Sequence, residues 1–550
     1  MTERFLSLVV ASGVALLPIF VAGSLGHLEP ILIAPLFVPH LWYLLRTNVV
    51  ASRSLFEGLD QRQTVLGIAL TVSIIAILLA FALLPVTARD ALIHHLAVPK
   101  WWLENGSTKP IEWYAVSYYP MLAQLAYLPI LEALSAKFTA IYQILYLLPF
   151  AASCAVLTKT IGARRPLPSW APAVAGLIAI SLPAVFRQAS EPLVDLQLAL
   201  FCAVGVIALL DSTIRVSTAG IALGLALSVK LNALPFVALA LLAAPLARVS
   251  FKRVLVCAML AGSIASPWFI RNYFATGNPL YPIGTVQSGA SSLESRGFIY
   301  GESTLEILAT PVTMLLFGAD EDPRRFDGVL SPLLLLAALG VWRFRHDRRV
   351  VFIAVLACSF FVVAQLGSGA RIRYLLPILP AGIALATAGL SHLPRHLVTA
   401  LLVGHLGWFA FYITKRAERL DLVTYYQSAE PDSAYLARML PEYRFIESVA
   451  ARIDKHDGVY LVLTGNRFFY LPFKARSGGY LSGPEFLAWL MNDRAEAELK
   501  QRNCTYVLMN RKLFERLIPP KDTGTVTDRL NRAFTSIATD KDLVLLKVRS

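Results

Sequence analysis

The sequence predicts a polytopic α-helical membrane protein with about 11–13 transmembrane helices and a small C-terminal α/β domain outside the membrane. Composition is the first observation: 56% of the 550 residues are hydrophobic and 16% are charged, whereas soluble proteins carry about 25% charged residues. Charge distribution is the second, because residues 415–550 hold 22 of the 50 Lys and Arg residues and 17 of the 36 Asp and Glu residues. These values exclude an ordinary soluble enzyme, a disordered chain and a fibrous repeat.

Three parts follow from this distribution. We expect residues 1–63 to form a transmembrane hairpin and a cytoplasmic loop, residues 64–414 to form the main membrane domain, and residues 415–550 to form a water-soluble domain. The first apolar run, 5–23, has no clear small-x-small cleavage site, and a second apolar run follows at once. A hairpin therefore fits better than a signal peptide.

Each predicted span is an apolar run of suitable length, because about 20 helical residues, each rising about 1.5 Å, cross about 30 Å of hydrocarbon. The runs are 5–23, 30–45, 64–84, 138–158, 168–186, 193–210, 254–270, 329–342, 350–366, 374–390 and 397–413.

The basic residues set the orientation of these spans. If the N-terminus is cytoplasmic, five basic loops fall on the cytoplasmic side, in agreement with the positive-inside rule. Segments 85–137, 187–192, 271–328 and 367–373 and the C-terminal domain then lie outside. The cytoplasmic basic residues are Arg46, Arg53, Arg62, Lys159, Arg164, Arg165, Arg215, Arg248, Lys252, Arg253, Arg343, Arg345, Arg348 and Arg349.

Four further apolar stretches need a separate interpretation. We interpret 118–134 and 303–317 as helices lying in the outer interface, because counting either as a span would invert the later loops. Residues 218–229 and 233–247 are too short to span and flank Lys230. A re-entrant or short-helix hairpin fits them, provided that protein or a water-filled cavity surrounds it.

The C-terminal region alternates helices and strands, which indicates a small α/β domain. We expect helices at 443–455 and 484–501 and strands at 458–464, 504–509 and 543–548. The region contains no GxGxxG or phosphate-loop motif, so a cap or acceptor-binding module is favoured over an independent enzyme.

The net charge of +14 does not by itself predict nucleic-acid binding, because the Lys and Arg residues cluster in short loops between apolar runs. Such charge suits anionic lipid head groups. The five cysteines are widely separated and form neither a disulfide framework nor a zinc-ligand spacing.

The first outer loop contains the best candidate for a catalytic acid or base. Asp90 follows span 64–84, and His94 at i+4 shares its helical face. A carboxylate fixed at the membrane surface can accept a proton from a hydroxyl. The alternative is that Asp90 merely ends or caps a helix, as acids at helix starts commonly do. Adjacent His94 and His95 point to different faces of a helix, so a shared metal ion is not favoured.

Two further segments place charge at membrane depth. Glu191 lies in the turn of the second outer loop, and Asp195 begins the next span. Ionisable groups at such positions are either functional or satisfy free helix N–H groups. Lys230 either anchors a lipid-linked phosphate or extends to the interface from a helix end.

Arginines mark the last two outer segments. Arg271 follows span 254–270, where it either binds phosphate oxygens as a fork or belongs to an aromatic and basic membrane border. Arg371 and Arg373 stand at the outer end of a span, against the positive-inside bias. They either neutralise a leaving phosphate or pair with acidic residues in a structural network.

Taken in this order, the segments resemble the GT-C membrane glycosyltransferases, in particular the bacterial branch similar to protein O-mannosyltransferases and the lipid A aminoarabinose transferase. The resemblance covers roughly residues 64–390 and rests on RDALIHHLAVPKWW, SEPLVDLQLALF, GLALSVKLNALPF, PWFIRNYFATGNPLYPI and RIRYLLPILP. Two features depart from the family: an extra N-terminal hairpin at 5–45, and Ala91 after Asp90 in place of a second acid.

The resemblance implies inverting transfer of a sugar from a polyprenyl-phosphate donor to an envelope glycan, lipid or protein at the outer face of a bacterial inner membrane. Asp90 is then the base, and the C-terminal domain is periplasmic. No cofactor is certain: metal use stays open, with a divalent metal ion not favoured. The implied donor-phosphate contacts are Lys230, Arg271, Arg371 and Arg373. We add His94, His95, Lys100, Glu191, Asp195 and Tyr281 as acceptor-binding candidates. The alternatives are a lipid-linked sugar transporter or flippase and a non-catalytic scaffold of polysaccharide assembly; we find no internal repeat of the kind that transporters often show.

Overall fold

The computed structural model describes residues 1–161, 166–283, 296, 300–368, 370–454, 456–479 and 482–549. Arg164 and Arg165 lie outside the described residues, as do residues 284–295 and 297–299 of the third predicted outer segment. The chain forms two compact units: unit 1 contains residues 1–84 and 99–423, and unit 2 contains residues 85–98 and 424–550.

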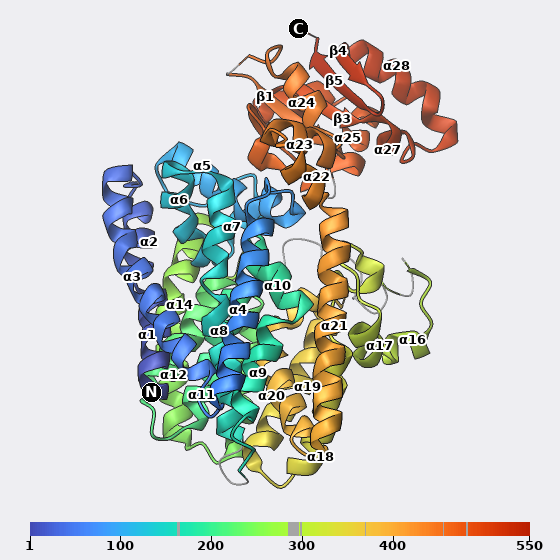
Figure 1. Cartoon of the computed structure of the whole chain (residues 1–550). Helices are drawn as coiled ribbons and strands as arrows, with labels where there is room; N and C mark the ends of the chain where they lie inside the picture. The colour runs from blue at the N-terminus through green and yellow to red at the C-terminus, as the bar shows by residue number, and fades with distance from the viewer. Residues whose placement is uncertain are drawn as a thin grey trace. The chain divides into compact units, whose positions relative to one another are not determined.

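Unit 1 is a bundle of helices whose long members run side by side (Figure 1). Its helices up to residue 250 are α1 (Thr2–Val14), α2 (Leu17–Ser24), α3 (Pro30–Leu55), α4 (Gln61–Ala82), α5 (Ala97–Asn105, which begins in unit 2), η2 (Ala115–Tyr118), η3 (Ala123–Ala126), α6 (Tyr127–Ala133), α7 (Ala136–Ile144), α8 (Leu147–Ile161), α9 (Ala171–Ile180), α10 (Pro183–Ser190), α11 (Asp195–Leu210), α12 (Val216–Val229), α13 (Ala233–Ala243) and η4 (Ala244–Ala247). The later helices are α14 (Phe251–Thr276), α16 (Thr304–Leu308), α17 (Thr310–Leu316), η5 (Pro323–Arg325), η6 (Pro332–Leu335), α18 (Leu336–Phe344), α19 (Arg348–Ser368), η7 (Ile372–Ile378), α20 (Leu379–Leu390) and α21 (Arg395–Arg419).

Within the described residues, seven helices are long and apolar enough to cross a membrane, or eight if the bent pair α9 and α10 is one span. These eight correspond to eight of the predicted runs. The other three runs, 30–45, 193–210 and 329–342, are also helical. The first lies in α3, which contains Pro35 and Pro39. The other two correspond to α11 and η6–α18, which are shorter than the helices that qualify as spans. The predicted fold class, a multi-pass helical membrane protein, is confirmed.

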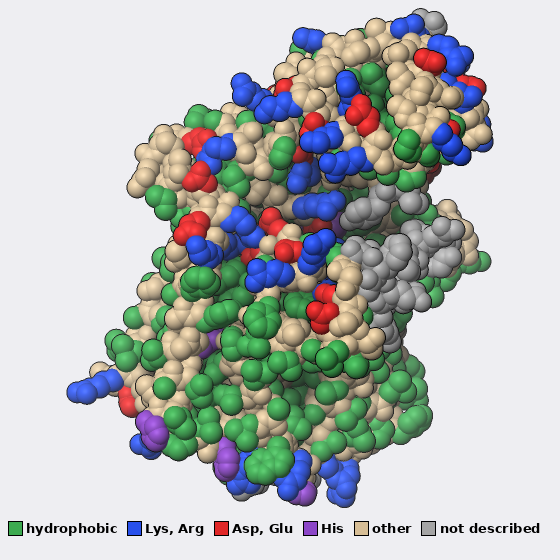
Figure 2. Space-filling model, turned by 90° about the vertical axis from the view of Figure 1, so that its right-hand side faces the viewer, with side chains coloured by type: hydrophobic (Ala, Val, Ile, Leu, Met, Phe, Trp, Pro, Cys, Tyr) green, Lys and Arg blue, Asp and Glu red, His purple; other side chains and the backbone are tan. Residues whose placement is uncertain are grey.

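The helices differ in how much apolar surface they expose. Within segment 136–161, 83% of an apolar 18-residue stretch is buried, whereas only 22% of the corresponding stretch is buried in α14 and in α21. Figure 2 shows hydrophobic side chains spread over the flank of the bundle, with Lys and Arg gathered at its lower end in that view. Apolar side chains on α14 and α21 therefore have the exposure that contact with lipid requires.

Small residues allow the helices of unit 1 to approach closely. A Cβ added at Gly340 of α18 would lie 2.0 Å from the carbonyl oxygen of Leu385 in α20. A Cβ at Gly389 of α20 would lie 2.3 Å from the carbonyl oxygen of Leu336. Glycine at both contact points lets the two backbones touch, as is common between membrane helices.

The short helices predicted around Lys230 are present, because α12 ends at Val229 and α13 begins at Ala233. Residues 118–134 fold into short pieces that include η3 and α6, and residues 303–317 contain α16 and α17. In both of these stretches the described helices are too short to cross a membrane.

Unit 2 contains a five-stranded sheet with strand order β2-β1-β3-β5-β4. The strands β2, β1 and β3 are parallel, and β5 runs antiparallel to both β3 and β4. The sheet packs its apolar side chains with Phe486, Trp489 and Phe514 from the helices. The strands are β1 (Gly458–Val462), β2 (Lys474–Arg476), β3 (Cys504–Asn510), β4 (Phe534–Asp540) and β5 (Leu543–Val548). The helices are η1 (Ala91–His95), α22 (Leu422–Gln427, which begins in unit 1), α23 (Asp432–Met439), α24 (Tyr443–Ala450), η8 (Phe468–Tyr470), α25 (Ser482–Met491), α26 (Ala495–Gln501), α27 (Arg511–Glu515), η10 (Pro520–Asp522) and α28 (Thr523–Ala533).

Segment 85–98 belongs to this unit although it lies far from the sheet in sequence. The Tyr470 hydroxyl donates a hydrogen bond to the carbonyl oxygen of Val86, at 3.1 Å. The π-helix η1 also packs against η8. The first outer loop therefore folds partly with the C-terminal domain, which the sequence did not predict.

Candidate active site

An ion pair joins the second outer turn to the end of α12. Lys230 caps the C-terminus of α12, and its Nζ lies 2.7 Å from Oδ1 of Asp195, the first residue of α11. The Asp195 side chain is fully buried, whereas the Lys230 side chain retains 22% exposure. An acid in the first turn of α11 is favourable for the helix dipole as well as for the ammonium.

A tyrosine and a second cation adjoin this pair. Lys230 Nζ lies 5.3 Å from the ring centre of Tyr374, and the Arg373 guanidinium lies 4.9 Å from the same ring. An Nη atom of Arg373 also donates to the Tyr374 hydroxyl at 3.1 Å. Two cations therefore flank one phenol, with cation–π attraction as well as hydrogen bonding.

Arg271 of α14 holds the first outer loop. Its guanidinium donates to the carbonyl oxygens of Thr108 at 3.2 Å and of Ser117 and Tyr118 at 3.1 Å each. It also lies 4.9 Å from the ring centre of Trp268. Because carbonyl oxygens are neutral, these contacts fix the guanidinium without cancelling its charge.

Tyr281 packs against the same part of the first outer loop, at Tyr118. The Asn272 side-chain amide donates to the carbonyl oxygens of Tyr118, at 2.8 Å, and Tyr281, at 3.1 Å. The rings of Tyr118 and Tyr281 pack edge to face at 4.6 Å. The third predicted outer segment thus begins against the first.

Tyr119 lies near a tyrosine from each set of contacts: Tyr374, beside Lys230, and Tyr281, beside Asn272. Burial raises its pKa, and the nearby hydroxyls of Tyr374 and Tyr281 raise the pKa further. Its phenol therefore stays a neutral hydrogen-bond donor at physiological pH. We refer to the whole set as the tyrosine–cation cluster: Lys230, Arg271, Arg373, Asp195, Tyr118, Tyr119, Tyr281 and Tyr374.

A second group of charges lies in the same unit. Arg187 contacts Glu191 at 3.4 Å, Asp320 at 3.4 Å and Asp327 at 3.0 Å. Arg416 of α21 forms ion pairs with Glu191 and with Asp320. We call this set the ion network: Arg187, Arg371, Arg416 and Arg419 with Glu191, Asp320, Glu321 and Asp327.

Asp320 is the centre of the ion network. Burial alone would raise the pKa of its carboxyl, but Arg187, Arg416 and Arg419, with a hydrogen bond from Tyr412, together hold that pKa below its ordinary value. Asp320 is therefore a carboxylate, and the network is formally neutral, with four arginines and four acids. Arg371 reaches Asp327 at 3.8 Å, which corresponds to the structural alternative left open by the sequence.

The same two chain segments supply both groups. Glu191 belongs to the ion network and Asp195 to the tyrosine–cation cluster. Arg371 likewise contacts the network, whereas Arg373 belongs to the cluster. The motifs SEPLVD and RIRY therefore each contribute one charged residue to each group.

The remaining predicted site residues lie elsewhere. Asp90 precedes η1 and belongs to unit 2 with His94 and His95, whose rings are 4.1 Å apart. Our expectation of an α-helix here is wrong, because residues 91–95 form a π-helix, with Leu96 N–H bonded to the Ala91 carbonyl at 2.8 Å. The 3.6-residue spacing therefore does not decide which side chains share a face. Lys100 lies on α5 in unit 1, 4.0 Å from Glu104.

In the part of the chain that the structure describes, the His, Cys, Asp and Glu side chains form no group of three or more that could hold a metal ion.

Sequence reasoning missed Arg187, Asp320, Asp327 and Arg416. A usable signal existed for two of them, because Arg187 directly follows the apolar run 168–186 and Arg416 lies just beyond the last apolar run, 397–413. Asp320 and Asp327 lie in a long loop that gives no periodic pattern.

Comparison with solved structures identifies the fold. ArnT from Cupriavidus metallidurans, bound to undecaprenyl phosphate, matches with a TM-score of 0.55 and 14% identity over 88% of this chain and 98% of that one. Its apo form matches with a TM-score of 0.54 and 15% identity over 87% and 97%. The chain has the GT-C fold.

Other comparisons are weaker. The archaeal oligosaccharyltransferase AglB from Archaeoglobus fulgidus, in complex with an inhibitory peptide and a dolichol-phosphate, matches with a TM-score of 0.48 and 10% identity over 87% of this chain and 73% of that one. Residues 31–290 match a family described as a domain of unknown function (DUF8201). No curated protein matches the sequence significantly.

Proposed function

We propose that this GT-C protein is a membrane glycosyltransferase that moves a sugar from a polyprenyl-phosphate donor to a hydroxyl of a cell-envelope acceptor. The transfer inverts the anomeric centre and takes place at the extracytoplasmic face. ArnT, which shares the fold, has been observed with undecaprenyl phosphate bound, and this supports a donor of the same lipid-phosphate class.

One observation carries the proposal: Arg271 keeps its positive charge beside the phenols of the tyrosine–cation cluster. Asp195 compensates Lys230, whereas Arg271 donates to the neutral oxygens of Thr108, Ser117, Tyr118 and Asn272. A guanidinium held by neutral oxygens next to neutral phenols suits a phosphate group, which accepts hydrogen bonds from both. In the ion network the four arginines are matched by four acids, so the network is better suited to holding the cluster in place.

The chemistry needs charge stabilisation at one oxygen. As the acceptor oxygen bonds to the anomeric carbon, the bond from that carbon to the phosphate oxygen breaks, and its electron pair leaves with the phosphate. Fixed cations near that oxygen stabilise the transition state more than the ground state. Lys230, Arg373 and Arg271 are the proposed groups.

The acceptor hydroxyl must lose a proton in the same step. Asp90 keeps the role expected from the sequence, as the proposed proton acceptor. It immediately precedes a π-helix, a distortion that occurs frequently at functional sites. Glu191, held by Arg187 and Arg416, is more plausible as a positioning residue than as an acceptor ligand.

Mass spectrometry of envelope glycolipids and glycoproteins tests the proposal. Cells that lack the protein should lose a fixed sugar mass from one class of molecule, and the wild-type chain should restore it. Lys230→Met should fail to restore it. Lys415→Met removes an exposed ammonium that pairs with Glu418 and should restore it fully. Identical glycan masses with and without the protein would contradict the proposal.

A further inference from the structure

A basic cavity lies at the opposite end of the helices that carry the tyrosine–cation cluster. Its volume is about 490 Å³, and its lining comes from the end of α11 and the starts of α12, α14 and α19. Lys252 and Arg253 line it near the start of α14, whereas Arg271 lies 18 residues beyond Arg253 on the same helix. At about 1.5 Å per residue, the two sites are about 27 Å apart along α14.

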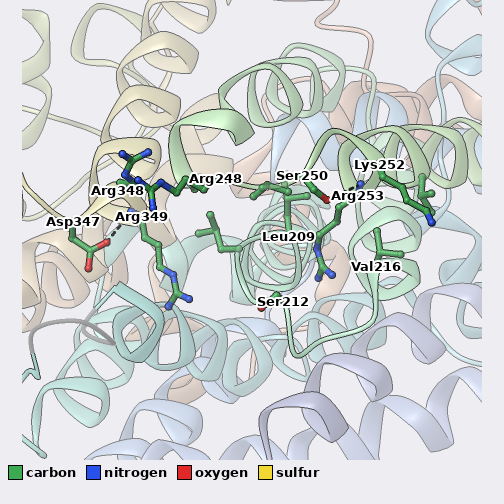
Figure 3. Close-up of a pocket in the computed structure, with 14 residues that line it drawn as sticks. Leu209, Ser212, Val216, Arg248, Ser250, Lys252, Arg253, Asp347, Arg348 and Arg349 are labelled. Atoms are coloured by element: carbon green, nitrogen blue, oxygen red, sulfur yellow. Dashed lines mark hydrogen bonds between the residues drawn. The ribbon is translucent and has the colours of Figure 1, made fainter.

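The lining contains far more positive than negative charge. The lining has five cations, Arg248, Lys252, Arg253, Arg348 and Arg349, and one carboxylate, that of Asp347. Figure 3 shows Arg248 beside Arg348 and Arg349 on one side, with Lys252 and Arg253 coming from α14 on the other. Such charges would repel one another if an anion did not compensate them.

Two of these cations are held by the protein. Arg253 donates to the carbonyl oxygens of Ala208, Asp211 and Ile214 at 2.6–2.8 Å. Arg349 donates to the carbonyl oxygen of Thr160 at 2.9 Å. Since carbonyls are neutral, both arginines are fixed in the cavity wall with their charge retained.

Arg248 ends the short helix η4 in a left-handed conformation, with φ 61° and ψ 30°. Glycine would be unstrained in this conformation. The position therefore retains a guanidinium at a cost in stability.

Apolar side chains beside the cavity indicate the kind of anion. Leu246 and Phe251 flank the lining residues 247–250 in sequence and are 41% and 79% exposed. Leu255, next to the lining residue Val256, is 47% exposed. Both α14 and α19 qualify as membrane spans from residues 251 and 348 onward, so the cavity lies where spans begin.

We propose that this cavity binds the phosphate headgroup of an anionic membrane phospholipid, whose acyl chains lie along Leu246, Phe251 and Leu255. The headgroup accepts hydrogen bonds from Arg248, Lys252 and Arg348. A free phosphate compound has the same anionic chemistry, but it would leave these apolar side chains uncovered.

Native mass spectrometry of the purified full chain in detergent tests the site, with phosphatidylglycerol, phosphatidylcholine and inorganic phosphate as separate probes. The test variant is Arg248→Gly/Lys252→Gln/Arg348→Gln, which spares Arg253 and Arg349. The control variant, Arg343→Gln/Arg345→Gln/Arg395→Gln, removes three charges that do not line the cavity. Each removed cation should weaken phosphatidylglycerol binding about 5-fold, hence on the order of 100-fold in the test variant. The control should change it by less than about 2-fold.

Arg248→Gly alone gives a second readout. It should weaken phosphatidylglycerol binding about 5-fold, yet melt at the same temperature as the wild type or higher, because glycine relieves the left-handed strain. Equal binding of phosphatidylglycerol and phosphatidylcholine to the wild type would overturn the proposal. So would undiminished binding by the test variant, an equal loss in the control variant, or inorganic phosphate that binds as tightly as phosphatidylglycerol.

Discussion

Lys230 and Asp195 form an ion pair, with Nζ 2.7 Å from Oδ1, at the point where α12 ends and α11 begins. The pair is asymmetric, because the carboxylate is fully buried whereas the ammonium side chain is 22% exposed. It holds Lys230 against Tyr374 and so fixes one cation of the tyrosine–cation cluster.

The asymmetry predicts unequal effects of removing each partner. Lys230→Met leaves a buried carboxylate without its cation and should cost about 3 kcal/mol of stability. Asp195→Asn leaves an ammonium that can turn towards water, and should cost about 1 kcal/mol. Thermal unfolding of the purified variants measures both.

The double variant Lys230→Met/Asp195→Asn completes the cycle. It should be more stable than Lys230→Met alone, with a coupling of about 1–3 kcal/mol between the two sites. Strictly additive losses would show that the two side chains do not interact in solution.

Asp320 predicts a stability that depends on pH. Its folded pKa lies below the ordinary value of 3.8, so its contribution is fully present above that pH and is lost as the pH falls through the folded pKa. Wild type and Asp320→Asn should therefore differ in melting temperature by the same amount at pH 7 and pH 5. The difference should shrink only below about pH 4.

Glu418→Gln is the control for Asp320→Asn. Glu418 pairs with Lys415, and both side chains are 58% exposed. An exposed pair contributes less than about 1 kcal/mol, so this variant should melt close to the wild type. A gap between wild type and Asp320→Asn that widens in acid would contradict the direction of the Asp320 shift.

Arg271→Lys separates hydrogen-bond geometry from charge. Lysine keeps the positive charge, but a single ammonium cannot reproduce the planar fork that contacts Thr108, Ser117 and Tyr118. The variant should lose about 1–3 kcal/mol of stability, because buried carbonyls lose their donors. Limited proteolysis should show faster cleavage within residues 106–120; an unchanged cleavage rate would mean that Arg271 does not hold this loop.

Two glycines on α20 provide a matched pair. Gly389→Ala places a Cβ 2.3 Å from a backbone oxygen of α18, and should destabilise the bundle by about 1–3 kcal/mol. Gly382→Ala meets no atom within 4 Å and should be neutral or stabilising by up to about 1 kcal/mol. Melting temperatures compare the two directly; equal effects would mean that α18 and α20 are not in close contact.

The sequence was sufficient for the fold class because hydrophobic runs and charge placement are local signals. The ordered motifs resemble those of the GT-C glycosyltransferases, and the structure has that fold. The sequence also predicted strands β1, β3 and β5, each an apolar run, but not β4, whose residues 534–540 are mostly exposed and polar. The three-residue β2 is too short for any periodic pattern.

Candidate site residues were predictable one by one, but their partners were not. Lys230 and Arg373 stand out as charges beside apolar runs, yet nothing in the sequence pairs Lys230 with Asp195 across 35 residues. The hydrogen bond from Tyr470 to Val86 spans 384 residues, so the assignment of Asp90 to the C-terminal unit also required coordinates. The roles of Asp90, Lys230, Arg271, Arg371 and Arg373 stay predictions.

Asp90→Asn tests the central claim most directly. In cells that lack the chromosomal copy, the envelope sugar mass restored by the wild type is measured for this variant by mass spectrometry. In parallel, binding of undecaprenyl phosphate by the purified variant is measured. If Asp90 is the base, the variant should not restore the sugar mass. It should still bind undecaprenyl phosphate and should melt at the wild-type temperature. Full restoration of the sugar mass by Asp90→Asn would contradict the assigned base and the mechanism built on it.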